Sequence, residues 1–264
     1  MMTPTLTSRV VVPLVLARLI YVVILILLFS LLNLWKWFPR ETASAPSGGA
    51  KSTLWSFNLH MGFMILAWTV FATEGVLAYA TWERSSFICG QPTRHSRVKV
   101  IHASLNFICA VMTAMGLLAI FQNHAVKEIP PLCSAHSWLG IITASLTFIA
   151  ALAGTVFFLL AKKLGISKDV RARVAPWHRL VGLLAYFLGL ATCSLGIQEK
   201  QGFITCASGR AYCLSKTLLT ILVILVYALG ACVAYVLSKE DRVTAGQLER
   251  EIDIFEDASE GLLP

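Results

Sequence analysis

Six long apolar runs dominate the sequence, and they restrict the chain to one class of fold. The runs cover roughly residues 10–34, 54–81, 98–121, 135–161, 176–197 and 214–238. As a helix that rises about 1.5 Å per residue, each run is long enough to cross a hydrocarbon core of about 30 Å. Lipid offers backbone groups no hydrogen-bond partners, so such runs must be helical. The chain is 57% hydrophobic and only 14% charged. We therefore predict an all-α integral membrane protein with six transmembrane helices.

The segments between the runs are short, so we expect one membrane domain over residues 10–238. A short cytosolic tail (1–9) precedes this domain and an acidic cytosolic tail (239–264) follows it. The first run is too long for a signal peptide and contains Arg18. We expect the long side chain of Arg18 to extend its charged end toward the membrane surface.

The distribution of basic residues predicts the orientation. Lysine and arginine near the helix ends are more numerous around 82–99 and 162–173 than in the segments on the other side. The positive-inside rule then places both termini in the cytosol. The basic residues are divided among short loops, which argues against nucleic-acid binding and favours lipid headgroups of the bilayer or a small anion. The sequence leaves open an endosomal or lysosomal, a vesicle or a plasma membrane.

Four of the six histidines lie near the start of a predicted helix. His60 and His136 fall on the non-cytosolic side, whereas His102 and His178 fall on the cytosolic side; 76 residues separate the members of each pair. Neutral imidazoles are common axial ligands of haem iron, and four-helix bundles hold cofactors in their core. We predict that helices 2–5 form a four-helix bundle around two haems. The pattern also leaves open an outer metal site that combines His60, His136 and His124.

Other polar residues have less specific patterns. Glu74 lies inside a predicted span, where an acid is costly, and we expect it to face the bundle near the cytosolic pair. Asn106 lies one turn after His102 and could bond within the haem pocket or to a helix backbone. Cys206 and Cys213 share the last non-cytosolic loop, and the sequence leaves open whether they form a disulfide.

Five segments together resemble the cytochrome b-561 family. They are "FNLH" (57–60), "VKVIHASLN" (98–106), "AHSWLGI" (135–141), "PWHRLVG" (176–182) and "LGIQEK" (195–200). Members of that family are six-helix, two-haem, ascorbate-dependent transmembrane reductases. The resemblance covers about residues 50–238. It implies two haem b groups, with His60 and His136 as ligands of the non-cytosolic haem and His102 and His178 as ligands of the cytosolic one.

The resemblance also implies substrate-binding residues. Lys99 and Arg171 match positions that bind cytosolic ascorbate, and His124 matches a residue of the non-cytosolic acceptor site, in the loop after helix 3. Two positions depart from the family pattern. His95 stands where a second lysine is common, and Cys133 stands where an aromatic residue is common.

The function implied is transmembrane electron transfer by an oxidoreductase. Cytosolic ascorbate would be the donor, monodehydroascorbate or a ferric chelate would be the non-cytosolic acceptor, and relatives suggest a homodimer. Two other functions remain compatible with the residues. One is a histidine-lined metal transporter, and the other is a haem-bearing anchor subunit of a larger redox complex.

Overall fold

The computed structural model of the chain describes residues 8–34, 49–83, 95–204, 206 and 213–260. All regular elements within these residues are helices, so the predicted all-α class is confirmed. Six helices are long and apolar enough to cross a membrane, in agreement with the number and order of the predicted spans. They are Val10–Leu32, Ser56–Trp82, Ser96–Lys127, Ala135–Leu159, Lys168–Gly202 and Leu214–Lys239.

The α-helical segments follow one another along the chain with short connections. They are α1 (Ser8–Leu34), α2 (Gly49–Leu66), α3 (Thr73–Ala78), α5 (His95–Lys127), α6 (Ala135–Gly154), α7 (Lys168–Gly202) and α8 (Leu214–Glu260).

Two of the spans contain π-helical stretches. In the second span, η1 (Ala67–Ala72) and η2 (Tyr79–Glu83) flank the short α3, and in the fourth span η3 (Thr155–Leu159) follows α6. A π-helical turn holds an extra residue and is frequent at functional sites. These stretches therefore change the direction in which side chains point along spans two and four.

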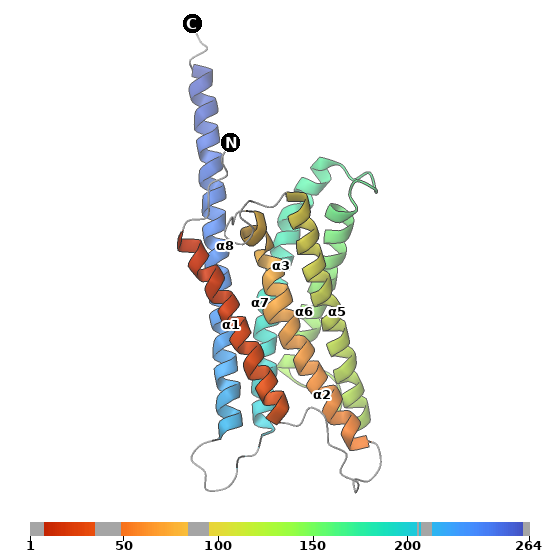
Figure 1. The fold of residues 1–264 in the computed structure, drawn as a ribbon. Coiled ribbons are helices and arrows are strands. Elements are labelled where there is room, and N and C mark those ends of the chain that lie inside the picture. Colours follow the sequence, from red (N-terminus) through yellow and green to blue (C-terminus); the bar gives the residue numbers. More distant parts are fainter. Residues whose placement is uncertain (1–7, 35–48, 84–94, 205, 207–212, 261–264) are drawn as a thin grey trace.

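Four spans form a bundle, and two flank it. The span that contains α2 and α3 packs against α5, while α6 packs against α7. Outside this bundle, α1 packs along α8, and α8 contacts α7 (Figure 1). A continuous apolar cluster joins α1 and α8 to the bundle, with Ile24, Leu222 and Leu229 fully buried within it. The bundle thus has four helices whose facing side chains can meet in its interior.

Two predicted boundaries are wrong. We expected the third span to end near residue 121, but α5 continues to Lys127, so His124 lies in its last turn rather than in a loop. We expected the fifth span to begin at Pro176, but α7 begins at Lys168, where the Ser167 side chain accepts a hydrogen bond from the backbone N–H of Val170. Proline is tolerated inside a membrane helix. Helices therefore extend beyond the apolar runs from which the spans were inferred.

The C-terminal part of the chain contains a disulfide and a long last helix. Cys206 and Cys213 form a disulfide, which settles the question that the sequence left open. α8 continues as a helix through the acidic segment to Glu260. The segment 1–7 and the side chain of His95 lie outside the described residues.

Candidate functional site

The first histidine pair joins α2 to α6. The imidazole rings of His60 and His136 have centroids 6.2 Å apart and planes at 79°. The Nδ1 of His60 lies 2.9 Å from the carbonyl oxygen of Gly116, and that of His136 lies 3.0 Å from the carbonyl oxygen of Thr192. A carbonyl only accepts, so each Nδ1 carries the proton and each Nε2 keeps a lone pair for a metal. We call these two residues the outer pair.

The second pair joins α5 to α7. The rings of His102 and His178 have centroids 6.3 Å apart and planes at 75°. His102 Nδ1 donates to the carbonyl oxygen of Gly75 at 2.7 Å, and the Asn106 amide donates to the His102 carbonyl oxygen at 2.8 Å. The Nδ1 of His178 is buried and has no hydrogen-bond partner in the described part of the chain. The ring of Phe158 packs against that of His178, with the ring centroids 5.2 Å apart. We call His102 and His178 the inner pair.

Glycines in neighbouring helices make room for the rings. A Cβ atom on Gly196 would lie 2.7 Å from Cε1 of His136, and one on Gly154 would lie 2.9 Å from Cε1 of His178. Both distances are shorter than real Cβ contacts allow. Sequence reasoning missed these glycines, although a signal exists. Gly154 and Gly196 each follow the histidine of their own helix by 18 residues.

A cavity of about 720 Å³ opens beside the outer pair. Its walls are mostly apolar and include both histidines of that pair. His124, Lys127 and Lys200 also line it, so the structure brings His124 to the same cavity as the outer pair. The two lysines were not predicted. They become recognisable only when the ends of α5 and α7 are seen to meet at one cavity.

Lys99 and Arg171 lie on the helices that carry the inner pair. The ammonium of Lys99 donates to the carbonyl oxygen of Phe158 at 3.1 Å, and Phe158 packs against His178. Lys99 is therefore close to the inner pair. Arg171 is seven residues before His178 on α7, and its Nε lies 3.4 Å from the carbonyl oxygen of Ser167. Arg171 is thus held near the start of its own helix.

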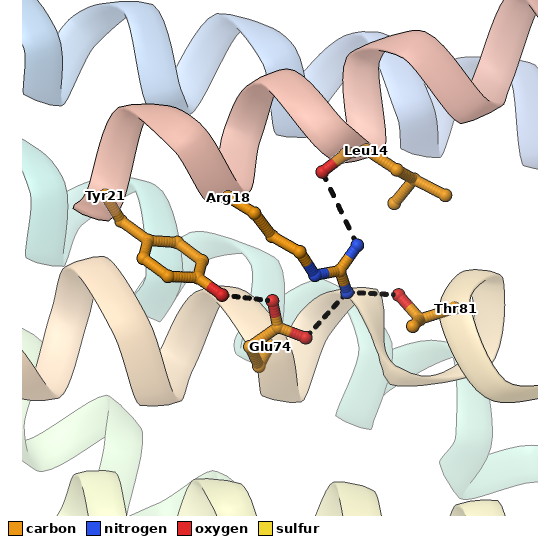
Figure 2. Close-up of polar contacts among 5 residues, drawn as sticks. All are labelled: Leu14, Arg18, Tyr21, Glu74 and Thr81. Carbon is orange, nitrogen blue, oxygen red and sulfur yellow. Dashed lines mark hydrogen bonds and ion pairs between the residues drawn. The ribbon is translucent and has the colours of Figure 1, made fainter. Parts of the chain in front are cut away.

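The expectation for Glu74 is wrong. Glu74 does not face the inner pair but forms a salt bridge of 2.8 Å with Arg18 of α1 (Figure 2). Tyr21 also donates to the Glu74 carboxylate, at 3.1 Å. The guanidinium of Arg18 is thus paired, and the extension of this side chain toward the membrane surface stays a prediction. The sequence could not indicate this pairing, because hydropathy does not say which faces of spans one and two meet.

The two pairs match the spacing of opposite ligands on one metal. With a metal–nitrogen distance of about 2 Å, and with Nε2 a further ~1 Å from each ring centre, two such imidazoles have centroids about 6 Å apart. Both observed separations agree with this value. No three His, Cys, Asp or Glu side chains gather as metal ligands among the residues that the structure describes. Fold and geometry together define a multi-pass membrane bundle in which two pairs of imidazoles face each other at a spacing that would suit a shared metal.

Comparisons with known proteins agree with this class. The family model of eukaryotic cytochrome b561 matches residues 59–204, which is more than half of the chain. The chain belongs to the cytochrome b561 family. Membership implies a b-type haem, which suits facing imidazole ligands. The matched range contains all four histidines of the two pairs.

Curated relatives have consistent names. The chain is 33% identical over 180 residues to a probable ascorbate-specific transmembrane electron transporter 1 of Oryza sativa subsp. japonica, covering 67% of this chain and 71% of that one. It is 30% identical over 185 residues to the transmembrane ascorbate-dependent reductase CYB561 of Sus scrofa, covering 70% and 69%. It is 29% identical over 184 residues to transmembrane ascorbate ferrireductase 1 of Arabidopsis thaliana, covering 70% and 72%.

Proposed function

We propose that this protein carries electrons across a membrane, from ascorbate on the cytosolic side to an acceptor on the other side, through two b-type haems. The observation that carries the proposal is the presence of two facing histidine pairs in one bundle, each with the ring spacing of opposite iron ligands. When bound, haem supplies the one-electron chemistry, while the chain supplies ligands, orientation and insulation. The names of the relatives support ascorbate as the donor.

The residues around the inner pair would receive ascorbate. Ascorbate is an anion at neutral pH, and charge-assisted hydrogen bonds from lysine or arginine suit an anionic oxygen. Lys99 lies one turn before His102, and Arg171 lies two turns before His178. We assign these two cations to the docking of ascorbate. Their contacts with nearby backbone carbonyls hold them close to the helices of the inner pair.

The cavity beside the outer pair would receive the electron acceptor. Its cationic residues Lys127 and Lys200 suit an anionic acceptor, either monodehydroascorbate or a ferric chelate. His124 lines the same cavity and is assigned to this site. The apolar remainder of the wall suits the flat face of a porphyrin, which would separate the acceptor from the bundle interior.

The proposed orientation follows from this assignment. The membrane domain spans residues 10–238, and both terminal segments, 1–9 and 239–264, are cytosolic. The disulfide between Cys206 and Cys213 belongs to the opposite side, where an oxidising compartment would preserve it. The basic segment at 162–173 then faces the cytosol and adds positive potential around the inner pair.

A reconstituted vesicle assay tests the proposal. Purified protein is placed in liposomes loaded with ascorbate, and a membrane-impermeant ferric chelate is added outside. We expect external reduction of iron that depends on the protein, with no iron entering the vesicles. The variant His102→Ala should lose the activity. Accumulation of iron inside would instead indicate a transporter, and reduction that needs a co-purifying subunit would indicate an anchor role.

A further inference from the structure

A polar cluster inside the membrane joins α1 to the second span. Arg18 forms a salt bridge with Glu74 at 2.8 Å and donates to the hydroxyl of Thr81 at 2.9 Å (Figure 2). The Tyr21 hydroxyl donates to the other Glu74 oxygen at 3.1 Å. The charged side chains are only 24% and 15% exposed. Ionisable groups within spans are costly and usually have a function.

The cluster holds a short segment of span two at two points. Glu74 lies near the start of α3, and Thr81 lies seven residues later, in η2. One guanidinium nitrogen of Arg18 bonds to both residues. The segment between them lies between two π-helical stretches, where the regular hydrogen-bond ladder is altered. α1 packs mainly along α8, and this cluster adds polar contacts between α1 and span two.

The other side of the same segment supports His102 of the inner pair. The residue that follows Glu74 is Gly75, whose carbonyl oxygen accepts from His102 Nδ1 at 2.7 Å. The Tyr79 ring lies 5.5 Å from the His102 ring. A Cβ on Gly75 would meet the amide of Asn106 at 2.5 Å, so the backbone there is tightly enclosed. A movement of this segment would therefore change the hydrogen bond to His102.

We propose that the Arg18–Glu74 ion pair positions the Gly75 carbonyl and thereby tunes the inner haem site from outside the bundle. This inference rests on the proposed function, because it assumes that His102 is an iron ligand. A hydrogen bond from Nδ1 makes an imidazole a more basic ligand, which favours the ferric state and lowers the reduction potential. Arg18 and Glu74 are positioning residues that act through Gly75 and His102. The family match begins at residue 59, so α1 lies outside the matched region.

The test uses variants that leave no unpaired buried charge. Replacing a buried ion pair by apolar residues is often neutral for stability, whereas removing one partner is costly. The double variant Arg18→Met/Glu74→Leu is therefore the main test, and Arg18→Lys is the conservative variant that keeps the charge. The readouts are haem per chain, an optical redox titration and the electron paramagnetic resonance signal of each haem. The control Thr220→Val removes a contact between α7 and α8, the bond to Gln201 at 2.8 Å.

We expect the double variant to raise the reduction potential of the inner haem and to alter its resonance signal. The potential and the signal of the outer haem should stay unchanged. A tenfold change in the oxidised-to-reduced ratio would appear as a shift of about 59 mV. Arg18→Lys, which keeps the positive charge, should leave the potential of the inner haem close to its wild-type value, and Thr220→Val should leave it unchanged. An unchanged inner haem in a folded double variant would overturn the inference. If the double variant fails to assemble, Tyr21→Phe is the replacement test, because it removes one hydrogen bond to Glu74 and leaves the ion pair in place. We then expect a smaller rise in the potential of the inner haem, and no rise would overturn the inference.

The two proposals fail in different ways. Wild-type protein without two haems would overturn the proposed function before any variant is compared. If the wild-type protein holds two haems but the reduction potential of the inner haem does not change when Arg18 and Glu74 are replaced, only the inference about positioning is overturned.

Discussion

At the scale of single residues, the proposed function depends on four histidines. Three of them donate Nδ1–H to a backbone carbonyl, from Gly116, Gly75 or Thr192. Such a bond fixes both the tautomer and the direction of the ring, so Nε2 of these three histidines keeps a lone pair for a metal. The exception is His178, whose ring is held by packing against Phe158.

Single replacements should separate the two sites. We expect His136→Ala to remove the outer haem and His102→Ala to remove the inner one, so that haem per chain falls from two to one in both variants. Each variant should leave a different absorbance spectrum after reduction by dithionite. Equal loss of both haems in a stably folded variant would contradict the assignment of two independent pairs.

The cations near the inner pair should affect ascorbate and not haem. Lys99→Gln or Arg171→Gln removes one charge-assisted contact, and we expect the KM for ascorbate to rise about tenfold, equivalent to about 1.4 kcal/mol. Haem content should be unchanged. The matched control is Lys163→Gln, since Lys163 is exposed on the same side. A KM unchanged by Lys99→Gln and Arg171→Gln would remove these residues from the ascorbate site.

At the scale of elements, glycines decide how closely neighbouring helices approach. α7 supplies a matched comparison, because a Cβ on Gly196 would press on His136 whereas a Cβ on Gly182 meets nothing within 4 Å. We expect Gly196→Ala to weaken retention of the outer haem during purification. Gly182→Ala should keep full haem content, since alanine favours helices over glycine by about 1 kcal/mol. Equal haem content in the two variants would show that the fit around His136 is loose.

The elements also show what the sequence could and could not predict. Apolar runs predicted the number, type and order of the spans, because lipid leaves a long apolar segment no alternative to a helix. The ends of α5 and α7 were missed, since helices continue into water wherever capping and propensity permit. The π-helical stretches were also missed, because a change in hydrogen-bond register leaves hydropathy unchanged.

For the candidate site, the sequence predicted which histidines pair but not which groups surround them. Equal spacing of His60 from His136 and of His102 from His178 predicted pairs on alternate helices, and the structure brings both pairs together. The acceptors of the Nδ1 protons are backbone atoms, which no residue type reveals. The partner of Glu74 was missed for a related reason, because the contact depends on how α1 turns toward span two.

At the scale of the whole molecule, orientation links the chemistry to the membrane. Cys133 is exposed and lies just before α6, on the predicted non-cytosolic side. In intact cells that carry the protein in the plasma membrane, an impermeant thiol reagent should label Cys133 when Cys89, which lies outside the described residues, is replaced by serine. Cys133→Ser in the same background should abolish labelling. Labelling of Cys133 only after permeabilisation would reverse the orientation and with it the direction of electron flow.

A haem count combined with a redox titration of the purified wild-type chain tests whether the two histidine pairs hold two haems that accept electrons from ascorbate. We expect two haem b groups per chain that titrate in two one-electron steps and are reduced on addition of ascorbate. A single haem per chain, no haem, or two haems that ascorbate leaves oxidised would contradict the proposed function.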